Sequence, residues 1–382
     1  MKKLLYRFET LMFALLLLCS PAHSSPILRD TPDITAQSCA LIEAKSGRAI
    51  YAKNAAIRLP MASTTKIMTG LLACESGIDF AEPITITADM TGIEGSSLYL
   101  KQDELYNFGE LVYAVLLNSA NDASVAVAIA VAGDLDSFVR LMNARAREIG
   151  LADTNFTNPH GLDDDAHYTT SLDLALLTAR ALENEEFAEC VSTKRVIIPE
   201  NATHDAKLLK NHNALLHSYD GAIGVKTGFT KRSGRCLVSS AQRDGVRLVC
   251  VTLNDPNDWR DHTAMLDAGF AALKRHCLAE AGELRYGIPY SAGILEIANT
   301  EQISAILPSD ADLSAVEVTY ELPRLIFPPI VYGEYMGRAV LRFDGEIVAE
   351  CALLAMEEAP AEVHQSPWER ITEIINKITH KG

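Results

Sequence analysis

The sequence predicts an α+β protein, with an antiparallel sheet flanked by helices in its first domain and a small all-β domain after it. Three observations support this fold class. The length of 382 residues suits about two domains. Residues 40–273 combine strand hairpins with several helical patterns, whereas the chain from about Tyr286 onward contains short strand patterns. The composition, 48% hydrophobic and 22% charged, is that of an ordinary globular protein.

The N-terminus has the parts of a secretory signal peptide, which we assign to residues 1–24. Three basic residues precede the apolar run Leu11–Cys19, and this run is too short to span a bilayer. Small residues suited to cleavage follow, up to Ser24. We therefore expect an exported protein; the alternative is a short buried helix.

The first domain, which we place at residues 32–276, is predicted to contain two hairpins and six helices. Each hairpin has two strand-forming runs around a short turn that contains glycine. The helices follow from apolar residues that recur at i, i+3 and i+4. The predicted strands are 40–44, 48–52, 236–242 and 246–253. The predicted helices are 61–74, 108–118, 122–131, 134–149, 172–182 (with Ser171 as its N-cap) and 264–273.

Residues 283–357 are predicted to form the small all-β domain. Short runs rich in β-branched and apolar residues, bounded by turn residues, indicate strands. Asp344-Gly345 joins the last two strands as a tight hairpin. The predicted strands are 294–297, 316–320, 339–343 and 347–353.

Residues 366–382 are predicted to form an amphipathic helix after a polar linker. Ser366 is a suitable N-cap, and Pro367 occupies the favoured first helical position. Trp368 and the isoleucines at 371, 374, 375 and 378 then fall on one face. The segment is too short and polar to cross a bilayer, so we expect it to anchor the chain in the membrane interface. The alternative is a helix packed on the β domain.

Several classes of partner and cofactor are excluded by the sequence. The net charge of −16 repels phosphate backbones, so nucleic acid is not expected as a partner. No glycine-rich phosphate loop or dinucleotide fingerprint occurs. The eight cysteines include no Cys-x-x-Cys pair, and the acids and histidines between His160 and His167 lack the spacing of zinc ligands. We therefore expect no metal and no cofactor.

Ser63-Thr64-Thr65-Lys66 opens the first predicted helix and carries the first chemical signal. Residues i and i+3 share a helix face, so the Lys66 nitrogen can lie beside the Ser63 hydroxyl. A serine hydroxyl becomes a good nucleophile only when a neighbouring base takes its proton. Lysine is such a base when burial or nearby positive charge lowers its pKa toward about 7–8. Alone, however, Ser-x-x-Lys is common at solvated helix starts.

Two further short motifs follow. Ser119-Ala120-Asn121 separates two apolar helices, where a buried polar triplet needs hydrogen-bond partners. Lys226-Thr227-Gly228 ends a strand pattern, where a lysine and a hydroxyl beside a small residue let a carboxylate approach the backbone. Taken singly, the first fits a capped helix break and the second an exposed strand end. Together with Ser-x-x-Lys, in this order, they are the motifs of class A β-lactamases and penicillin-binding proteins.

The sequence most resembles the low-molecular-weight penicillin-binding D-alanyl-D-alanine carboxypeptidases, the peptidase S11 family. The resemblance rests on Leu59–Thr69, Asn118–Ala123, Asn158–Leu162 and Val225–Thr230, and it runs from about residue 36 to residue 273 and more loosely beyond. It implies the β-lactamase/transpeptidase-like fold for the first domain.

The resemblance also implies catalytic roles. Ser63 would be the acylated nucleophile, and Lys66 would be its base. Ser119 would relay the proton to the leaving amine. Asn121 would position the peptide and Lys66.

Substrate-binding roles are implied in the same way. Lys226 and Thr227 would bind the terminal carboxylate, and Gly228 would keep that strand open. The backbone N–H groups of the nucleophile and of Phe229 would form an oxyanion hole. An arginine later in the fold often assists carboxylate binding in the family. Arg260 is the candidate, and a surface salt bridge is an equal alternative for it.

The implied function is an exported serine-type D-Ala-D-Ala carboxypeptidase. It would remove the last D-alanine from peptidoglycan stem peptides, bind β-lactam antibiotics such as penicillin covalently and serve cell-wall biogenesis and cell shape. We expect it on the outer face of the cytoplasmic membrane. Two alternatives stay open. The first is a β-lactamase on the same fold, which would need a deacylating carboxylate, but no matching Glu motif follows Asn121. The second is a non-catalytic wall-binding scaffold, which would not need the intact motifs.

Overall fold

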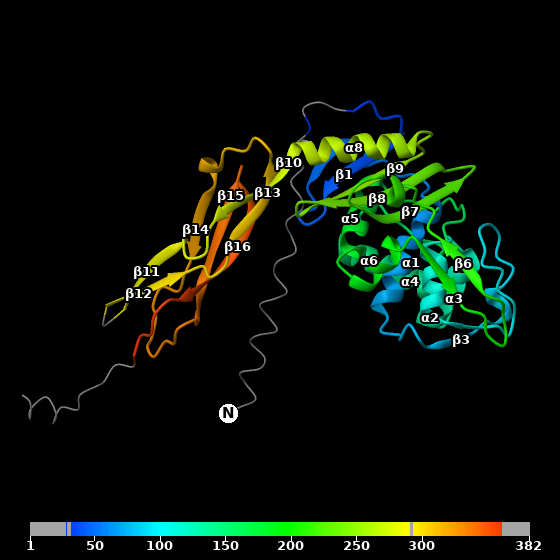
Figure 1. Cartoon of the computed structure of the whole chain (residues 1–382), viewed down its shortest axis with the longest axis horizontal. Helices are drawn as coiled ribbons and strands as arrows, with labels where there is room; N and C mark the ends of the chain where they lie inside the picture. The colour runs from blue at the N-terminus through cyan, green and yellow to red at the C-terminus, as the bar shows by residue number, and fades with distance from the viewer. Residues whose placement is uncertain (1–27, 29–31, 291–292, 361–382) are drawn as a thin grey trace, which may run out of the picture. The chain divides into compact units, whose positions relative to one another are not determined.

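The computed structural model describes residue 28 and residues 32–290 and 293–360 (Figure 1). The signal peptide predicted at 1–24 and the helix predicted at 366–382 lie outside the described residues. The chain divides into two compact units, residues 1–273 and 274–382, called the first and second unit below.

A five-stranded antiparallel sheet, in the order β2-β1-β9-β8-β7, forms the centre of the first unit (Figure 1). Both predicted hairpins are confirmed. The N-terminal hairpin joins the later strands because β1 pairs with β9, with Leu41 opposite Cys250. One edge strand of the sheet is β7, which carries Lys226-Thr227-Gly228. The strands are β1 (Ser38–Glu43), β2 (Ala49–Lys53), β7 (Ala222–Thr230), β8 (Gly234–Arg243) and β9 (Val246–Leu253).

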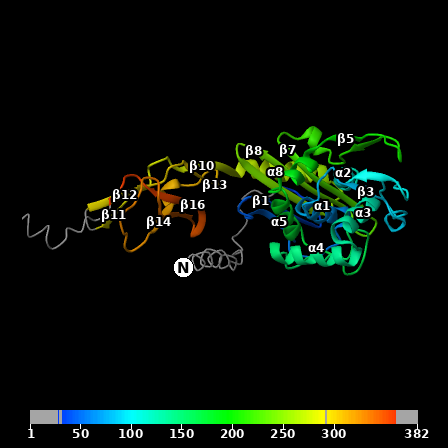
Figure 2. The ribbon, with the colours of Figure 1, turned by 90° about the horizontal axis from the view of Figure 1, so that it is seen from below.

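Helix α8 (Asp258–Ala272) covers one face of this sheet, and helices α1 to α6 lie on the opposite side (Figures 1 and 2). Gly269 lets α8 approach closely, because a Cβ there would lie 2.7 Å from Leu248 and 2.8 Å from Leu41. The helix begins at Asp258 rather than at the predicted residue 264. Its first turn is polar, so it lacks the apolar periodicity on which the prediction depended.

The helical layer surrounds α1 (Lys66–Glu75), whose residues from Lys66 to Cys74 are all buried. The predicted break between two apolar helices is confirmed, because α2 ends at Leu116 and α3 begins at Asn121. Gly150, with φ +89°, ends α4 as predicted. The other helices are α2 (Phe108–Leu116), α3 (Asn121–Ala132), α4 (Leu135–Ile149), α5 (Ser171–Ala181), α6 (Glu185–Ser192) and α7 (Leu215–Ser218).

The cap of α5 differs from the prediction by one residue. The side chain of Thr170, rather than that of Ser171, accepts the backbone N–H of Asp173 at 3.0 Å. Ser171 is the first helical residue, and its hydroxyl contacts the hydroxyl of Ser38 on β1 at 2.8 Å. Short elements that were not predicted are α6, α7, β3 (Pro83–Thr85), β4 (Leu105–Asn107), β5 (Arg195–Ile198) and β6 (Lys207–Lys210).

The described part of the second unit consists of β-strands and one short 3-10 turn, Leu313–Ala315, which confirms the predicted β domain. Five strands form a sheet in the order β11-β12-β16-β15-β14, and β10 pairs with β13. The Asp344-Gly345 turn joins β15 to β16. Strands β10, β11 and β13 were not predicted. The strands are β10 (Leu273–Ala279), β11 (Arg285–Tyr290), β12 (Gly293–Ala298), β13 (Ile303–Pro308), β14 (Glu317–Glu321), β15 (Tyr335–Phe343) and β16 (Glu346–Ala355).

Candidate active site

Ser63 lies in a single 3-10 turn, Ala62–Thr65, directly before α1. Ala62 has φ +48°, a left-handed conformation that L-residues rarely adopt. Two glycines approach this turn. A Cβ on Gly161 would overlap the carbonyl oxygen of Ala62, and a Cβ on Gly228 would lie 3.1 Å from the backbone nitrogen of Ser63. The turn is therefore enclosed by two backbones that come close because they carry no side chains there.

Lys66 is fully buried and extends back toward the serine, as the i, i+3 spacing predicted. Among the described residues its Nζ has three hydrogen-bond partners. They are Ser63 Oγ at 3.1 Å, Asn121 Oδ1 at 2.6 Å and the carbonyl oxygen of His160 at 2.6 Å. The last two are acceptors only, so they take two protons of the amine.

The two buried lysines of the site are held toward their neutral forms. Burial is the main cause that lowers the pKa of Lys66 well below 10.5, and the charge of Lys226 lowers it further. Burial also lowers the pKa of Lys226, to about 7. Both amines are thus closer to neutral than a solvated lysine.

Ser119 and Asn121 come from the break between α2 and α3. Ser119 is buried and has φ +60°, and Asn121 begins α3. Asn121 Nδ2 donates to the carbonyl of Glu94 at 2.5 Å, which fixes the amide so that its oxygen faces Lys66. The next residue, Asp122, accepts the backbone N–H of Leu98 at 2.9 Å and fastens this neighbouring loop to the start of α3.

The third motif lies on the edge strand β7. Lys226 is buried, and its Nζ donates to the carbonyl of Thr227 at 2.9 Å. Thr227 is half-buried and points to the opposite side of the strand, because successive strand side chains alternate. Phe229 lies on the same side as Thr227, and the residue is 66% exposed.

The loop at 157–162 supplies backbone groups to the site. Besides the carbonyl of His160, the carbonyl of Pro159 accepts the hydroxyl of Thr69 in α1 at 2.6 Å. Burial lowers the pKa of His160 to about 3, with a smaller contribution from Lys66. This histidine is therefore neutral, and it acts here through its main chain.

His167 holds the turn that carries Ser63 through a hydrogen bond to Thr65. Its Nδ1 accepts the backbone N–H of Thr157 at 3.0 Å, which leaves the ring proton on Nε2 to donate to Thr65 Oγ1 at 2.7 Å. Thr65 in turn donates to the carbonyl of Ala62 at 2.8 Å. Burial lowers the pKa of His167 to about 4, so this arrangement persists at neutral pH.

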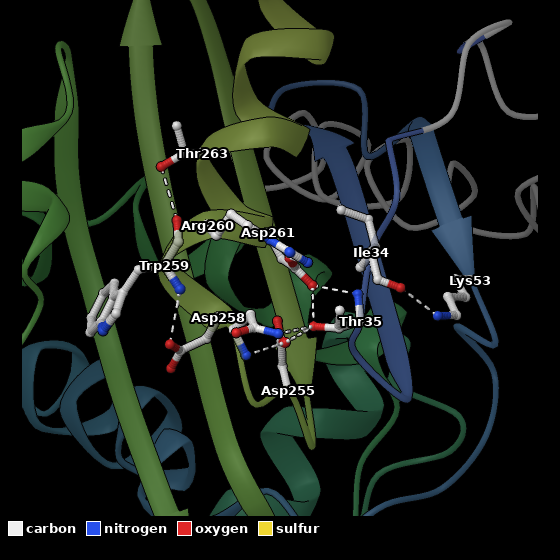
Figure 3. A network of polar contacts seen from close by, with 10 residues as sticks. Ile34, Thr35, Lys53, Asp255, Asp258, Trp259, Arg260, Asp261 and Thr263 are labelled. Atoms are coloured by element: carbon white, nitrogen blue, oxygen red, sulfur yellow. Dashed lines mark hydrogen bonds and ion pairs between the residues drawn. The ribbon is translucent and has the colours of Figure 1, made fainter.

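Arg260 is engaged in another network (Figure 3). Its guanidinium donates twice to Asp261, at 3.0 and 2.8 Å, and Asp261 accepts the backbone N–H of Thr35 at 2.5 Å. Of the two roles expected for Arg260, carboxylate binding or a surface salt bridge, the structure shows the salt bridge, to Asp261. A different arginine, Arg235 on β8, lies opposite Phe229 in the β7–β8 register.

Arg235 shares a side of the sheet with Thr227. Paired residues in antiparallel strands project to the same side, and so do residues two apart along one strand. Its guanidinium is paired with Asp258, with Nε 3.0 Å from Oδ2 and Nη2 2.9 Å from Oδ1, while 45% of the side chain remains exposed.

Known proteins share both the sequence and the fold. A sequence model of the D-alanyl-D-alanine carboxypeptidase family, peptidase S11, matches residues 26–257. The chain belongs to this family. It is 32% identical to the D-alanyl-D-alanine carboxypeptidase DacF of Bacillus subtilis over 334 residues, 85% of each chain. It is 30% identical to DacA of Haemophilus influenzae over 349 residues, 86% of each chain.

A solved structure of an S11 relative has the same architecture. The crystal structure of penicillin binding protein 5 from Haemophilus influenzae matches with a TM-score of 0.68 and 28% identity, over 87% of this chain and 99% of that one. The predicted transpeptidase-like domain followed by a β domain is therefore confirmed.

The sequence identified the residue types of the site but missed the main-chain contributions. Ser63, Lys66 and Asn121 were predicted to come together, and they do. The carbonyl of His160 and the support from His167 were not foreseen. His160 lies in the stretch Asn158–Leu162, which resembles the family but suggests no chemistry by itself, and the sequence offered the two histidines only as metal ligands with unsuitable spacing.

Proposed function

We propose that this chain is an exported serine-type D-Ala-D-Ala carboxypeptidase that removes the terminal D-alanine from peptidoglycan stem peptides. The observation that carries the proposal is the environment of Lys66. A neutral amine has two protons and one lone pair. Because Asn121 Oδ1 and the His160 carbonyl accept the two protons, the lone pair is directed at the Ser63 hydroxyl.

The chemistry then proceeds through an acyl-enzyme. Lys66 takes the proton of Ser63 as the oxygen attacks the peptide carbonyl, and Ser119 passes a proton to the departing D-alanine amine. The backbone N–H groups of Ser63 and Phe229 stabilise the oxyanion, and each such donor is worth about 3 kcal/mol. Water then releases the shortened peptide, whereas a β-lactam leaves the enzyme acylated.

Binding of the substrate carboxylate completes the proposal. Lys226 and Thr227 bind it, with Gly228 admitting it to the strand. Arg235, rather than Arg260, assists the binding of the substrate carboxylate. It shares the side of the sheet with Thr227, and its side chain is partly exposed. Arg235→Ala should raise KM for a peptide that ends in D-Ala-D-Ala about tenfold, and Arg260→Ala should leave it unchanged.

The proposed location is the outer face of the cytoplasmic membrane. The support is the signal-like sequence at 1–24 and the amphipathic pattern at 366–382. Within the part of the chain that the structure describes, no helix is long and apolar enough to cross a membrane. Interfacial attachment through the C-terminal segment would account for membrane residence.

Mass spectrometry after penicillin treatment tests the proposed chemistry. The intact protein should gain the mass of penicillin on Ser63, and Ser63→Ala should gain nothing while keeping its melting temperature. Release of D-alanine from a D-Ala-D-Ala peptide should disappear in the same variant. Rapid penicillin turnover would favour a β-lactamase, and absence of both acylation and D-alanine release would favour a wall-binding scaffold.

A further inference from the structure

The loop between β14 and β15 exposes an unusual amount of apolar surface. Its sequence from Leu325 to Tyr332 is an unbroken apolar run. The exposed fractions are 71% for Leu325, 79% for Phe327, 60% for Val331 and 63% for Tyr332. Consecutive exposed apolar residues of this kind mark an interaction surface on a folded protein.

The fold fixes which side chains of this loop face outward. Ile326 packs against the core of the second unit, and Ile330 is buried. The main chain of Ile330 exchanges two hydrogen bonds with Ala359, at 2.9 and 3.0 Å. Because two isoleucines and a backbone bridge hold the loop, the outward position of Phe327 follows from packing of its neighbours.

Other exposed apolar side chains lie at the same end of the second unit. Tyr335, 62% exposed, is opposite Leu354 near the end of β16. Strand β12 runs antiparallel to β16, and the carbonyl of Glu296 accepts the backbone N–H of Met356. Ile294, 66% exposed, therefore lies further along in the direction of Ala359. Figure 1 shows the β11–β12 hairpin and the end of β16 at this end of the unit.

The C-terminal segment leaves the β domain at this same end. Only residues 360–365 separate Ala359 from Ser366. The seven steps from Ala359 to Ser366 span at most about 25 Å. The amphipathic sequence that begins at Ser366 is thus tethered close to the exposed loop.

We propose that the apolar loop 325–332 inserts into the interfacial region of a lipid bilayer next to the C-terminal segment. This end of the second unit is then a membrane-contact surface. Aromatic and aliphatic side chains suit that depth, where Tyr keeps its hydroxyl in the wet headgroup layer. The inference extends the proposed membrane location and is independent of the proposed chemistry.

Apolar contact, rather than charge, drives this insertion. Arg324 is the basic residue beside the run, whereas Glu334, Glu357 and Glu358 are exposed acids at the same end. An excess of acids gives no attraction to anionic lipid. Binding to vesicles should therefore be nearly independent of salt and of the fraction of anionic lipid.

Vesicle cosedimentation of the purified full chain tests the proposal. With vesicles of phosphatidylethanolamine and phosphatidylglycerol, Phe327→Asp should lower the partition coefficient about tenfold, the ratio that corresponds to about 1.4 kcal/mol. Ile347→Asp is the matched control, because Ile347 is an exposed residue of β16 beside the hairpin turn at the other end of the strand. It should bind like the wild type. Should Phe327→Asp fail to fold, Tyr332→Ser tests the same surface with the same expectation.

Three results would overturn the proposal. The first is unchanged vesicle binding by Phe327→Asp. The second is a large fall in the melting temperature with unchanged binding, which would mean that the chain itself covers the loop. The third is a dimer that the substitution dissociates while vesicle binding persists, which would assign the surface to a second copy. Release of D-alanine from a soluble peptide should stay normal in all variants, so this test and that of the catalytic proposal give separate answers.

Discussion

Replacing Lys226 by methionine should stabilise the first unit while abolishing its activity. The aliphatic stem of lysine is similar in volume to methionine, so the buried space stays filled. The substitution removes an amine that burial disfavours in its charged form. It also removes the charge that helps to lower the pKa of Lys66, which acts in the same direction.

The magnitude follows from the pKa of Lys226. Burial lowers this pKa from 10.5 to about 7, whereas the unfolded chain keeps the ordinary value. Between these values the unfolded state binds more protons, so wild-type stability rises with pH across this window. At about 1.4 kcal/mol per pKa unit, the penalty is about 4 kcal/mol at pH 7 and about 1 kcal/mol at pH 10. The lost hydrogen bond to Thr227 offsets about 1 kcal/mol at either pH.

Denaturant unfolding at pH 7 and pH 10 measures this difference. In a Trp368→Phe background the remaining tryptophan is Trp259 in α8, so its fluorescence reports unfolding of the first unit. We expect Lys226→Met to gain about 3 kcal/mol at pH 7 and almost nothing at pH 10. Lys101→Met, at an exposed position, is the control and should show no such trend. An equal gain at both pH values would refute the argument, because a desolvated amine must lose its penalty as it deprotonates.

Three further predictions concern the site and the tail. Lys66→Arg should abolish acylation by penicillin, since arginine stays protonated. In the wild type, the acylation rate should fall at acid pH as Lys66 gains a proton. Stopped-flow measurement of the acylation rate of each protein against pH tests the two expectations. Gly161→Ala should slow acylation at least a hundredfold without changing any reacting side chain, because the new methyl group displaces the Ala62 carbonyl; normal acylation would show that the turn adapts. Ile374→Glu with Ile375→Glu should release the chain from liposomes without lowering its melting temperature; a lower melting temperature with unchanged binding would support a helix packed on the β domain.

The sequence predicted those parts of the fold that have strong local patterns. The two hairpins of the central sheet and the buried helix α1 each carry a run of apolar residues long enough to show its period. The strands β5 and β6 are only four residues long, so alternation is barely visible in them. The start of α8 was predicted too late because its first turn has no apolar period. The contacts of this turn are hydrogen bonds of Asp258 and Asp261.

Arg235, the residue proposed to assist carboxylate binding, could have been located from strand register. The strand pattern that ends at Gly228 and the strand 236–242 were predicted, but their pairing was not, and this pairing places Arg235 opposite Phe229. The prediction considered arginines late in the chain because of the resemblance, and it therefore selected Arg260. Register, rather than order along the chain, decides which side chains share a surface.

The geometry of the nucleophile depends on main-chain contacts as well as on the catalytic side chains. A left-handed alanine costs of order 1 kcal/mol or more, so the turn at Ala62 persists only if its surroundings hold it. Gly161 and Gly228 press on it from segments distant in sequence, and the hydrogen-bond chain from His167 through Thr65 holds its carbonyl. A protein could therefore keep every motif serine, lysine and asparagine and still place the hydroxyl wrongly, because an error of about 1 Å at a reacting atom lowers a rate about a hundredfold. The identity of the small residues around the turn, rather than the motif alone, should distinguish active members from inactive ones.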